Sequence, residues 1–253
     1  ARPLHPDNAK KPDEDMMSTL TDSLHNLVIA NRILAHEGVV DAFGHVSIRH
    51  PDNPERYLLS HSRAPELITE DDLIEFTLDG DAADLRDRTP YGERMIHGAA
   101  YEMRADVHAV IHNHSYELIP FSATGVPIQP MTHTYGVIGA DINAWDIRDK
   151  FGETDHLVRT MEQGRDLAQC LGERTVTLMK RHGSLVVGRN LKEAVMTAVY
   201  LQVNARIQIQ AMQMGTPDFL TPGEVDKCTT TLFSPLGLDR AWEYWRTRAG
   251  YGG

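Results

Sequence analysis

The chain has 253 residues, of which 41% are hydrophobic and 24% are charged, a composition typical of a globular protein with one large domain or two small ones. Its formal net charge of −11 disfavours nucleic acid and anionic membranes as partners, because both need a basic surface. An anionic small molecule remains compatible with this charge, since the local charge of a cleft matters more than the sum. No apolar run reaches the roughly 18 residues of a transmembrane helix. The two cysteines, Cys170 and Cys228, belong to no ligand motif and are expected to be reduced thiols of a cytoplasmic protein.

The sequence predicts one folded domain with an N-terminal arm and a C-terminal tail of separate function. Residues 1–17 are polar and contain prolines, so we expect a surface arm and not a secretory signal. Residues 18–253 are expected to form a single domain. Its tail, about 216–253, is predicted to serve as a lid or a subunit contact because it carries three large aromatic residues, Trp242, Trp245 and Tyr251.

The first part of the chain predicts one helix and three short strands. Apolar residues at helical spacing predict a helix over residues 18–36, which ends before Gly38. The strands are expected at residues 43–49, 57–60 and 73–78. In the first strand, alternation places Val46 and Ile48 on one face and His45, Ser47 and Arg49 on the other.

Helices and strands alternate in the rest of the chain. Thr89-Pro90 predicts a helix start, with Glu93 in the first turn of a helix that runs to about Met103. Further helices are expected near residues 116–123, 155–171 and 190–214, and further strands at 108–114, 175–180 (ending at His182-Gly183) and 185–188. This alternation predicts a layered α/β domain, and the hairpins favour an antiparallel or mixed central sheet.

The clearest chemical signal is His112-Asn113-His114 at the end of an apolar strand. Residues i and i+2 of a strand share a face, so the two imidazoles are suited to one divalent metal ion. The alternative is a pair of structural histidines held by hydrogen bonds. His182 is the best candidate for a third ligand, and Gly183 beside it allows a close backbone approach or a positive φ. Glu93 is a candidate ligand and acid/base, although a helix start also favours a carboxylate for its dipole alone.

Taken together, five motifs resemble the class II aldolase/adducin family over roughly residues 20–215. They are Gly44-His45-Val46-Ser47, Ser60-His61-Ser62-Arg63, Glu93 with His97-Gly98-Ala99-Ala100-Tyr101, Val110-Ile111-His112-Asn113-His114, and His182-Gly183. The resemblance implies a layered αβα fold with a mixed, mainly antiparallel sheet. It also implies that His112, His114 and His182 bind one divalent metal (Zn, Mn, Fe or Co) and that Glu93 is the acid/base. Family members usually form homotetramers with active sites between subunits.

Three departures from the sugar-phosphate aldolases of this family affect the anion pocket. His45 replaces an Asn, Arg63 replaces a loop Gly, and Tyr91-Gly92 replaces a pair of serines. An Arg fills the space in which a glycine amide approaches a phosphate, so the phosphate cradle is expected to be lost. Arg63 suits a planar carboxylate, although a solvent-exposed loop arginine is the plain alternative. Substrate binding is accordingly predicted for a set of loop and strand-end residues, His45, Ser60, Ser62 and Arg63.

The G-H-V-S-x-R pattern resembles the decarboxylase-like branch of the family. That branch acts on hydroxylated aromatic dicarboxylates such as hydroxypyridine dicarboxylates and dihydroxyphthalates, so we expect a metal-dependent decarboxylase of aromatic catabolism. The tyrosine acid of some family aldolases aligns near Thr134, so the resemblance implies that His133 or Tyr135 assists, from the same or a neighbouring subunit. The alternatives are an aldolase or epimerase on a hydroxy-keto acid or sugar phosphate, and a non-catalytic module like the adducin head.

Overall fold

The computed structural model describes residues 19–252, so the expected arm at 1–17 lies outside the described residues. Seven strands form one sheet in the order β3-β2-β1-β4-β7-β6-β5, and every neighbouring pair is antiparallel except β5 with β6. The predicted α/β fold with a mixed, mainly antiparallel sheet is thereby confirmed. The strands are β1 (His45–Arg49), β2 (Arg56–Ser60), β3 (Leu73–Thr77), β4 (Ala109–Asn113), β5 (Asn143–Trp145), β6 (Val176–Met179) and β7 (Gly183–Gly188).

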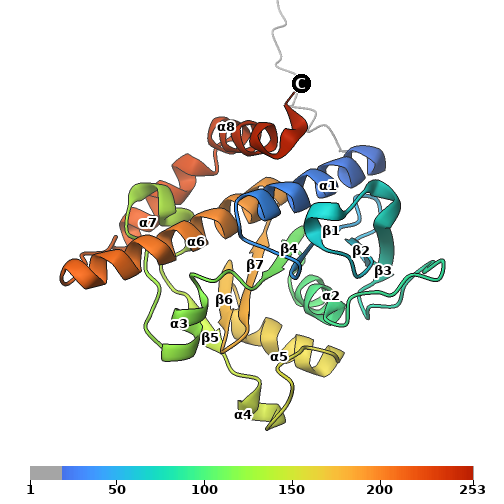
Figure 1. The fold of residues 1–253 in the computed structure, drawn as a ribbon, viewed down its shortest axis with the longest axis horizontal. Helices are drawn as coiled ribbons and strands as arrows, with labels where there is room; N and C mark the ends of the chain where they lie inside the picture. Colours follow the sequence, from blue (N-terminus) through green and yellow to red (C-terminus); the bar gives the residue numbers. More distant parts are fainter. Residues whose placement is uncertain (1–18, 253) are drawn as a thin grey trace, which may run out of the picture.

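Helices cover both faces of the sheet (Figure 1). One face carries α1 (Leu20–His36), α6 (Leu191–Met214) and α8 (Pro235–Arg246), and the other carries α2 (Arg94–Met103) packed on α5 (Met161–Leu171). The remaining elements are α3 (Ile119–Thr124), α4 (Arg148–Phe151), α7 (Pro222–Leu232), η1 (Pro65–Leu67), η2 (Glu70–Asp72), η3 (His133–Ile138) and η4 (Thr247–Tyr251).

The sheet separates two apolar cores. Val46 and Ile48 of β1 point into the core shared with α1, α6 and α8, and each fully buried side chain of this kind contributes about 1.5–3 kcal/mol. His45 and Ser47 point to the opposite face, toward α2, as the alternation predicts. One face of β1 therefore stabilises the fold while the other carries polar groups.

The helix that follows the third strand begins later than the sequence signal predicts. Thr89 and Pro90 pair with the loop after β2: Ser62 N donates to Thr89 O at 2.8 Å, and Pro90 forms an isolated bridge with His61. These backbone bonds hold residues 89–90 extended, so α2 starts only at Arg94. Glu93 consequently occupies the N-cap position, and its side chain makes no capping hydrogen bond.

His182 lies in the turn between β6 and β7, not at the end of a strand as expected. The turn is tight because Arg181 adopts the left-handed conformation, with φ of 61°. The Arg181 guanidinium bonds both carboxylate oxygens of Asp146 at 2.6 Å, and His182 N donates to Met179 O at 3.1 Å. These contacts fix the backbone on each side of the His182 side chain.

Several other boundaries differ from expectation. The helix expected at 155–171 begins only at Met161, because Thr160 forms a capping box with Gln163. The sequence did not predict β5, α4, α7 or α8. In the tail, Trp242 and Trp245 are buried in the core of this chain, and the role of the tail as a lid or subunit contact remains a prediction.

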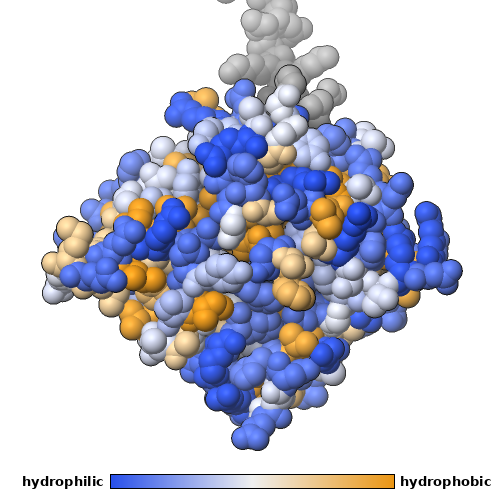
Figure 2. Space-filling view, in the orientation of Figure 1, coloured by the Kyte–Doolittle hydropathy of each residue, from blue (hydrophilic) through white to orange (hydrophobic). Residues whose placement is uncertain are grey.

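The surface is largely polar, as expected for a chain in which 24% of the residues are charged. The face in Figure 2 is mainly hydrophilic, with apolar residues in small separate groups. Among the helices within residues 19–252, none is both long and apolar enough to cross a membrane.

Candidate metal centre

Three imidazoles and one carboxylate converge where β4 ends and β7 begins. His112 Nε2 lies 2.9 Å from His114 Nε2, which lies 3.0 Å from His182 Nε2. Glu93 Oε2 lies 3.6 Å from the Nε2 atoms of both His112 and His182. All four ligand atoms fall within 4.8 Å of one another. The structure thus brings together every residue that the sequence proposed for the metal, although β4 ends at Asn113 and His114 lies one residue beyond the strand.

Gly183 lets the β6–β7 turn approach β4 closely. A Cβ at this position would lie 2.0 Å from Asn113 O and 3.0 Å from His114 Cδ2, so any larger residue would force the strands apart. Of the two roles considered for this glycine, close backbone approach is the one observed, and its φ is not positive.

The His112 ring is oriented by its second nitrogen. Its Nδ1 donates to Ser184 O at 3.0 Å, which leaves the Nε2 lone pair directed at the other ligands. Burial lowers the pKa of His112 and of His114 below the usual range for histidine, so both imidazoles are neutral. A neutral imidazole with a free lone pair is the form that binds metal.

Glu93 is held as a carboxylate at the start of α2. Burial alone would raise its pKa, but the close imidazoles, His182 foremost, outweigh burial and lower the pKa well below its usual range. Its other oxygen, Oε1, accepts a hydrogen bond from Val158 N at 2.9 Å. One carboxylate oxygen is therefore anchored by the backbone, and the other faces the imidazoles.

A buried chain of hydrogen bonds lies behind the metal ligands. His45, which pairs directly with His112 across β1 and β4, has its Nδ1 2.6 Å from His97 Nε2. His97 Nδ1 lies 2.6 Å from Ser47 Oγ, which lies 2.8 Å from the Tyr101 hydroxyl. Burial lowers the pKa of His97 to about 3, so this ring is neutral. The chain occupies one nitrogen of His45 and orients its ring.

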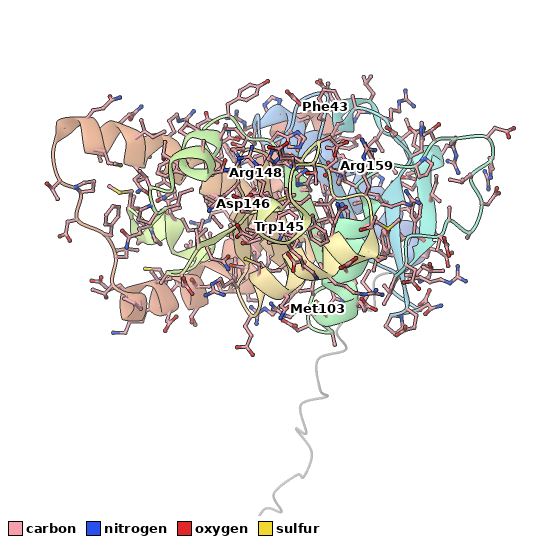
Figure 3. All side chains as sticks on the ribbon, turned by 90° about the horizontal axis from the view of Figure 1, so that it is seen from below. Phe43, Met103, Trp145, Asp146, Arg148 and Arg159 are labelled. Carbon is pink, nitrogen blue, oxygen red and sulfur yellow. The ribbon has the colours of Figure 1, made fainter. Side chains whose placement is uncertain are left out.

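A cavity of about 430 Å³ opens beside this cluster. Its walls include Glu93 and His114 from the cluster and His45, Ser62 and Arg63, which the sequence proposed for substrate binding. Other wall residues were not proposed: Phe43, Tyr91, Leu157 and Arg159. In Figure 3, Phe43 and Arg159 lie toward the same edge of the molecule and Met103 toward the opposite edge.

The loop that carries Arg63 is braced from two sides. Arg63 Nη1 donates to Asp72 Oδ2 at 2.8 Å, and His61 Nε2 lies 2.9 Å from the other oxygen of the same carboxylate. The Tyr91 hydroxyl donates to the Arg63 carbonyl, and the Tyr91 ring lies 4.5 Å from that of His45, centroid to centroid. Arg63 thus keeps part of its guanidinium available in a fixed loop.

A larger cavity, of about 640 Å³, lies beside α7 at the opposite ends of β4 and β7. It contains none of the four clustered ligands, which form the sole group of this kind found in the described part of the chain. Chemistry, and not size, therefore identifies the smaller cavity as the candidate active site.

Comparison with known proteins identifies the family. The sequence-family model described as "Class II Aldolase and Adducin N-terminal domain" matches residues 25–209 of this chain. This chain belongs to the class II aldolase and adducin family. Among the relatives, "Decarboxylase tropJ" of Talaromyces stipitatus is 34% identical over 196 residues, covering 72% of this chain and 73% of that protein. The 3,4-dihydroxyphthalate decarboxylase of Arthrobacter keyseri is 27% identical over 199 residues, covering 75% and 78%. The resemblance to the decarboxylase-like branch is therefore confirmed.

A solved structure shares the fold of this chain. The L-fuculose 1-phosphate aldolase from Glaciozyma antarctica superposes with a TM-score of 0.77 at 22% identity, covering 96% of this chain and 94% of that one. At this identity the likeness concerns the fold alone.

The donor set of this class II aldolase-family chain fits a divalent cation. Four ligands at about 2.0–2.1 Å in a tetrahedron are roughly 3.3 Å apart, close to the separations observed between neighbouring donors here. The His182 Nδ1 is buried without a hydrogen-bond partner in the described residues, so this ring is held by its turn and by whatever its Nε2 binds.

Three of the residues proposed for catalysis or substrate binding are not at the cavity of this chain. Ser60 is buried at the end of β2 and contributes to no wall. His133 is exposed on η3, and Tyr135 packs against Tyr200 with ring centroids 5.6 Å apart. Roles for His133 and Tyr135 at the site of a neighbouring subunit remain predictions.

Proposed function

We propose that this protein is a metal-dependent lyase that removes carbon dioxide from a hydroxylated aromatic carboxylate or dicarboxylate. The observation that carries the proposal is the cluster of Glu93 and three imidazoles beside a cavity lined by Arg63 and His45. The similarity to two decarboxylases supports the same reaction class.

His112, His114 and His182 are the proposed metal ligands. The bound divalent ion (Zn, Mn, Fe or Co) would supply a Lewis acid that stabilises negative charge on the substrate oxygen next to the bond that breaks. Three neutral imidazoles leave positions open for substrate, as a catalytic centre requires.

Glu93 is the proposed acid/base. Loss of carbon dioxide leaves an electron pair on a ring carbon, and this carbon must receive one proton. Glu93 Oε2 lies among the ligand atoms while Oε1 is tied to Val158 N, so the carboxylate can carry a proton to the ring from a fixed position. The acid acts after it has taken up a proton from the substrate hydroxyl or solvent.

Arg63, with His45 and Ser62, is proposed to hold a second carboxylate. The guanidinium is anchored to Asp72 through Nη1, and its remaining N–H groups have no hydrogen-bond partner in the described part of the chain. His133 and Tyr135 would complete the site from the neighbouring subunit of a homotetramer.

The test measures the products released by the zinc-loaded protein from 3,4-dihydroxyphthalate and from L-fuculose 1-phosphate. The proposal expects carbon dioxide from the first compound and no aldehyde from the second. Glu93→Gln should lower kcat by at least about 100-fold, the usual contribution of general acid–base catalysis. Wild-type turnover in this variant would remove Glu93 from the mechanism.

A second candidate is an aldolase or epimerase on a hydroxy-keto acid or a sugar phosphate. It is favoured by the shared fold with an L-fuculose 1-phosphate aldolase, since breaking a C–C bond next to a metal-bound oxygen is common to both reactions. Aldehyde release without carbon dioxide release would support this alternative.

A further inference from the structure

A second arginine, Arg159, lies on the cavity wall and has no role in the function proposed so far. Its Nη1 lies 3.4 Å from the position that a Cβ on Gly92 would occupy, so the guanidinium covers the wall segment just before Glu93. Arg63 contacts the same segment through Tyr91, one residue earlier. Both arginines therefore lie beside residues 91–92, Arg63 through its backbone carbonyl and Arg159 through its guanidinium.

The backbone of Arg159 is fixed to the catalytic carboxylate and to α5. The preceding amide, Val158 N, donates to Glu93 Oε1 at 2.9 Å, and Arg159 N donates to Gln163 Oε1 at 2.8 Å. Thr160 then caps α5. This arginine is thus held one residue away from a direct contact with Glu93, unlike an arginine on a free surface loop.

The side chain is anchored on one edge and open on the other. Its Nε and Nη2 donate to Asp155 Oδ2 at 3.1 and 2.8 Å. Its Nη1 has no hydrogen bond within residues 19–252, and the side chain is 55% exposed. Arg63 repeats this arrangement, with one nitrogen on Asp72 and the others without a partner. A guanidinium that is held by one carboxylate and open on its other edge is suited to bind a second, external carboxylate.

We infer that Arg159 binds a carboxylate of the substrate together with Arg63, and that this pair makes the site selective for aromatic dicarboxylates over monocarboxylates. The inference rests on the proposed function and deepens it. Each guanidinium is neutralised on one edge by Asp72 or Asp155, and its open edge offers N–H donors to a carboxylate of a dianion in the cavity.

The experiment measures binding of two probes, phthalate and benzoate, to the zinc-loaded protein by calorimetry, so that no turnover is needed. The wild type should bind phthalate more tightly than benzoate. Arg159→Gln should weaken phthalate binding by about 10-fold, the loss expected for one charge-assisted hydrogen bond, and should change benzoate binding by less than about 2-fold. Arg159→Lys, which keeps the charge but not the planar fork, should lie in between.

Arg148→Gln is the matched control. Arg148 is an exposed arginine of α4, labelled near Arg159 in Figure 3, and it does not line the cavity. Its replacement should leave the affinity for both probes unchanged. Zinc affinity and melting temperature of each variant show whether the fold and the metal centre are intact.

Equal phthalate affinity in Arg159→Gln and wild type would overturn the inference, as would a wild type that binds the two probes equally. Failure of the proposed function is seen separately, as absence of carbon dioxide release. If inorganic phosphate competes with phthalate only when Arg159 is present, Arg159 keeps its role in anion binding while the preference for carboxylates is contradicted.

Discussion

Replacing Gly183 by alanine tests whether close contact between β7 and β4 sets the geometry of the metal ligands. The new Cβ would lie 2.0 Å from Asn113 O, whereas real Cβ contacts essentially never fall below 3.0 Å. The start of β7 would therefore have to retreat by about 1 Å, and overpacking of this size costs about 1–3 kcal/mol.

The retreat would displace His182, which immediately precedes Gly183. Metal–nitrogen bonds of about 2.0–2.1 Å tolerate errors of only about 0.2 Å, so a shift of about 1 Å removes His182 from effective coordination. We expect Gly183→Ala to lower zinc affinity by at least about 10-fold, the lower end of the range seen when residues supporting a ligand are changed.

The assay is a zinc titration against a chromophoric chelator, combined with thermal unfolding of the metal-free protein. Gly223→Ala in α7 is the control, because a Cβ there meets nothing within 4 Å and the φ is not positive. It should leave zinc affinity unchanged and stabilise the protein by up to about 1 kcal/mol. Wild-type zinc affinity in Gly183→Ala would refute the argument that strand contact positions His182.

Metal removal and pH provide two further expectations. Treating the loaded protein with a chelator should lower its melting temperature, because zinc at 100 times its Kd adds about 2.7 kcal/mol to the native state, and identical melting before and after treatment would contradict the metal site. His97 has a native pKa of about 3 against 6.5 for the free side chain, so the unfolded chain binds more protons between these values. The contribution of neutral His97 to the free energy of unfolding is complete above about pH 6.5 and is lost as the pH falls toward 3. At about pH 5, about 2 kcal/mol of it has been lost. Urea unfolding of the chelated protein at pH 7 and pH 5 should show a smaller acid loss in His97→Gln than in wild type, and equal losses would exclude this role.

The sheet and the closeness of His112 and His114 could be predicted from the sequence because they depend on short-range periodicity. His112 and His114 meet on one face, as their two-residue spacing predicts, although the strand ends at Asn113 between them. In β1 the same rule separates Val46 and Ile48 from His45 and Ser47. His182 and Glu93 were candidates from their places beside predicted elements, and the motif resemblance then joined them to His112 and His114, to which no local pattern connects them.

The remaining features depend on long-range contacts that leave little local signal. Thr89-Pro90 is a good helix start in isolation, but pairing of residues 89–90 with the loop after β2 overrides it. Arg159 was missed because residues 155–160 were expected to be helical, whereas they form a loop that reaches Glu93. The network behind His45 could have been suspected, because His97 and Tyr101 are four residues apart and share one face of α2.

The metal ligands and the cavity walls are supported by different kinds of backbone. His112, His114 and His182 lie at the joined ends of two central strands, whose opposite face is sealed by the α1, α6 and α8 core. The walls come largely from loops, at residues 62–64, 91–92 and 157–159. Substitutions of loop residues that belong to neither core, such as Ser62, Arg63 and Arg159, can therefore reshape what the cavity accepts with little change in core packing. Such an arrangement permits substrate range to diverge while the bond-breaking centre is inherited unchanged.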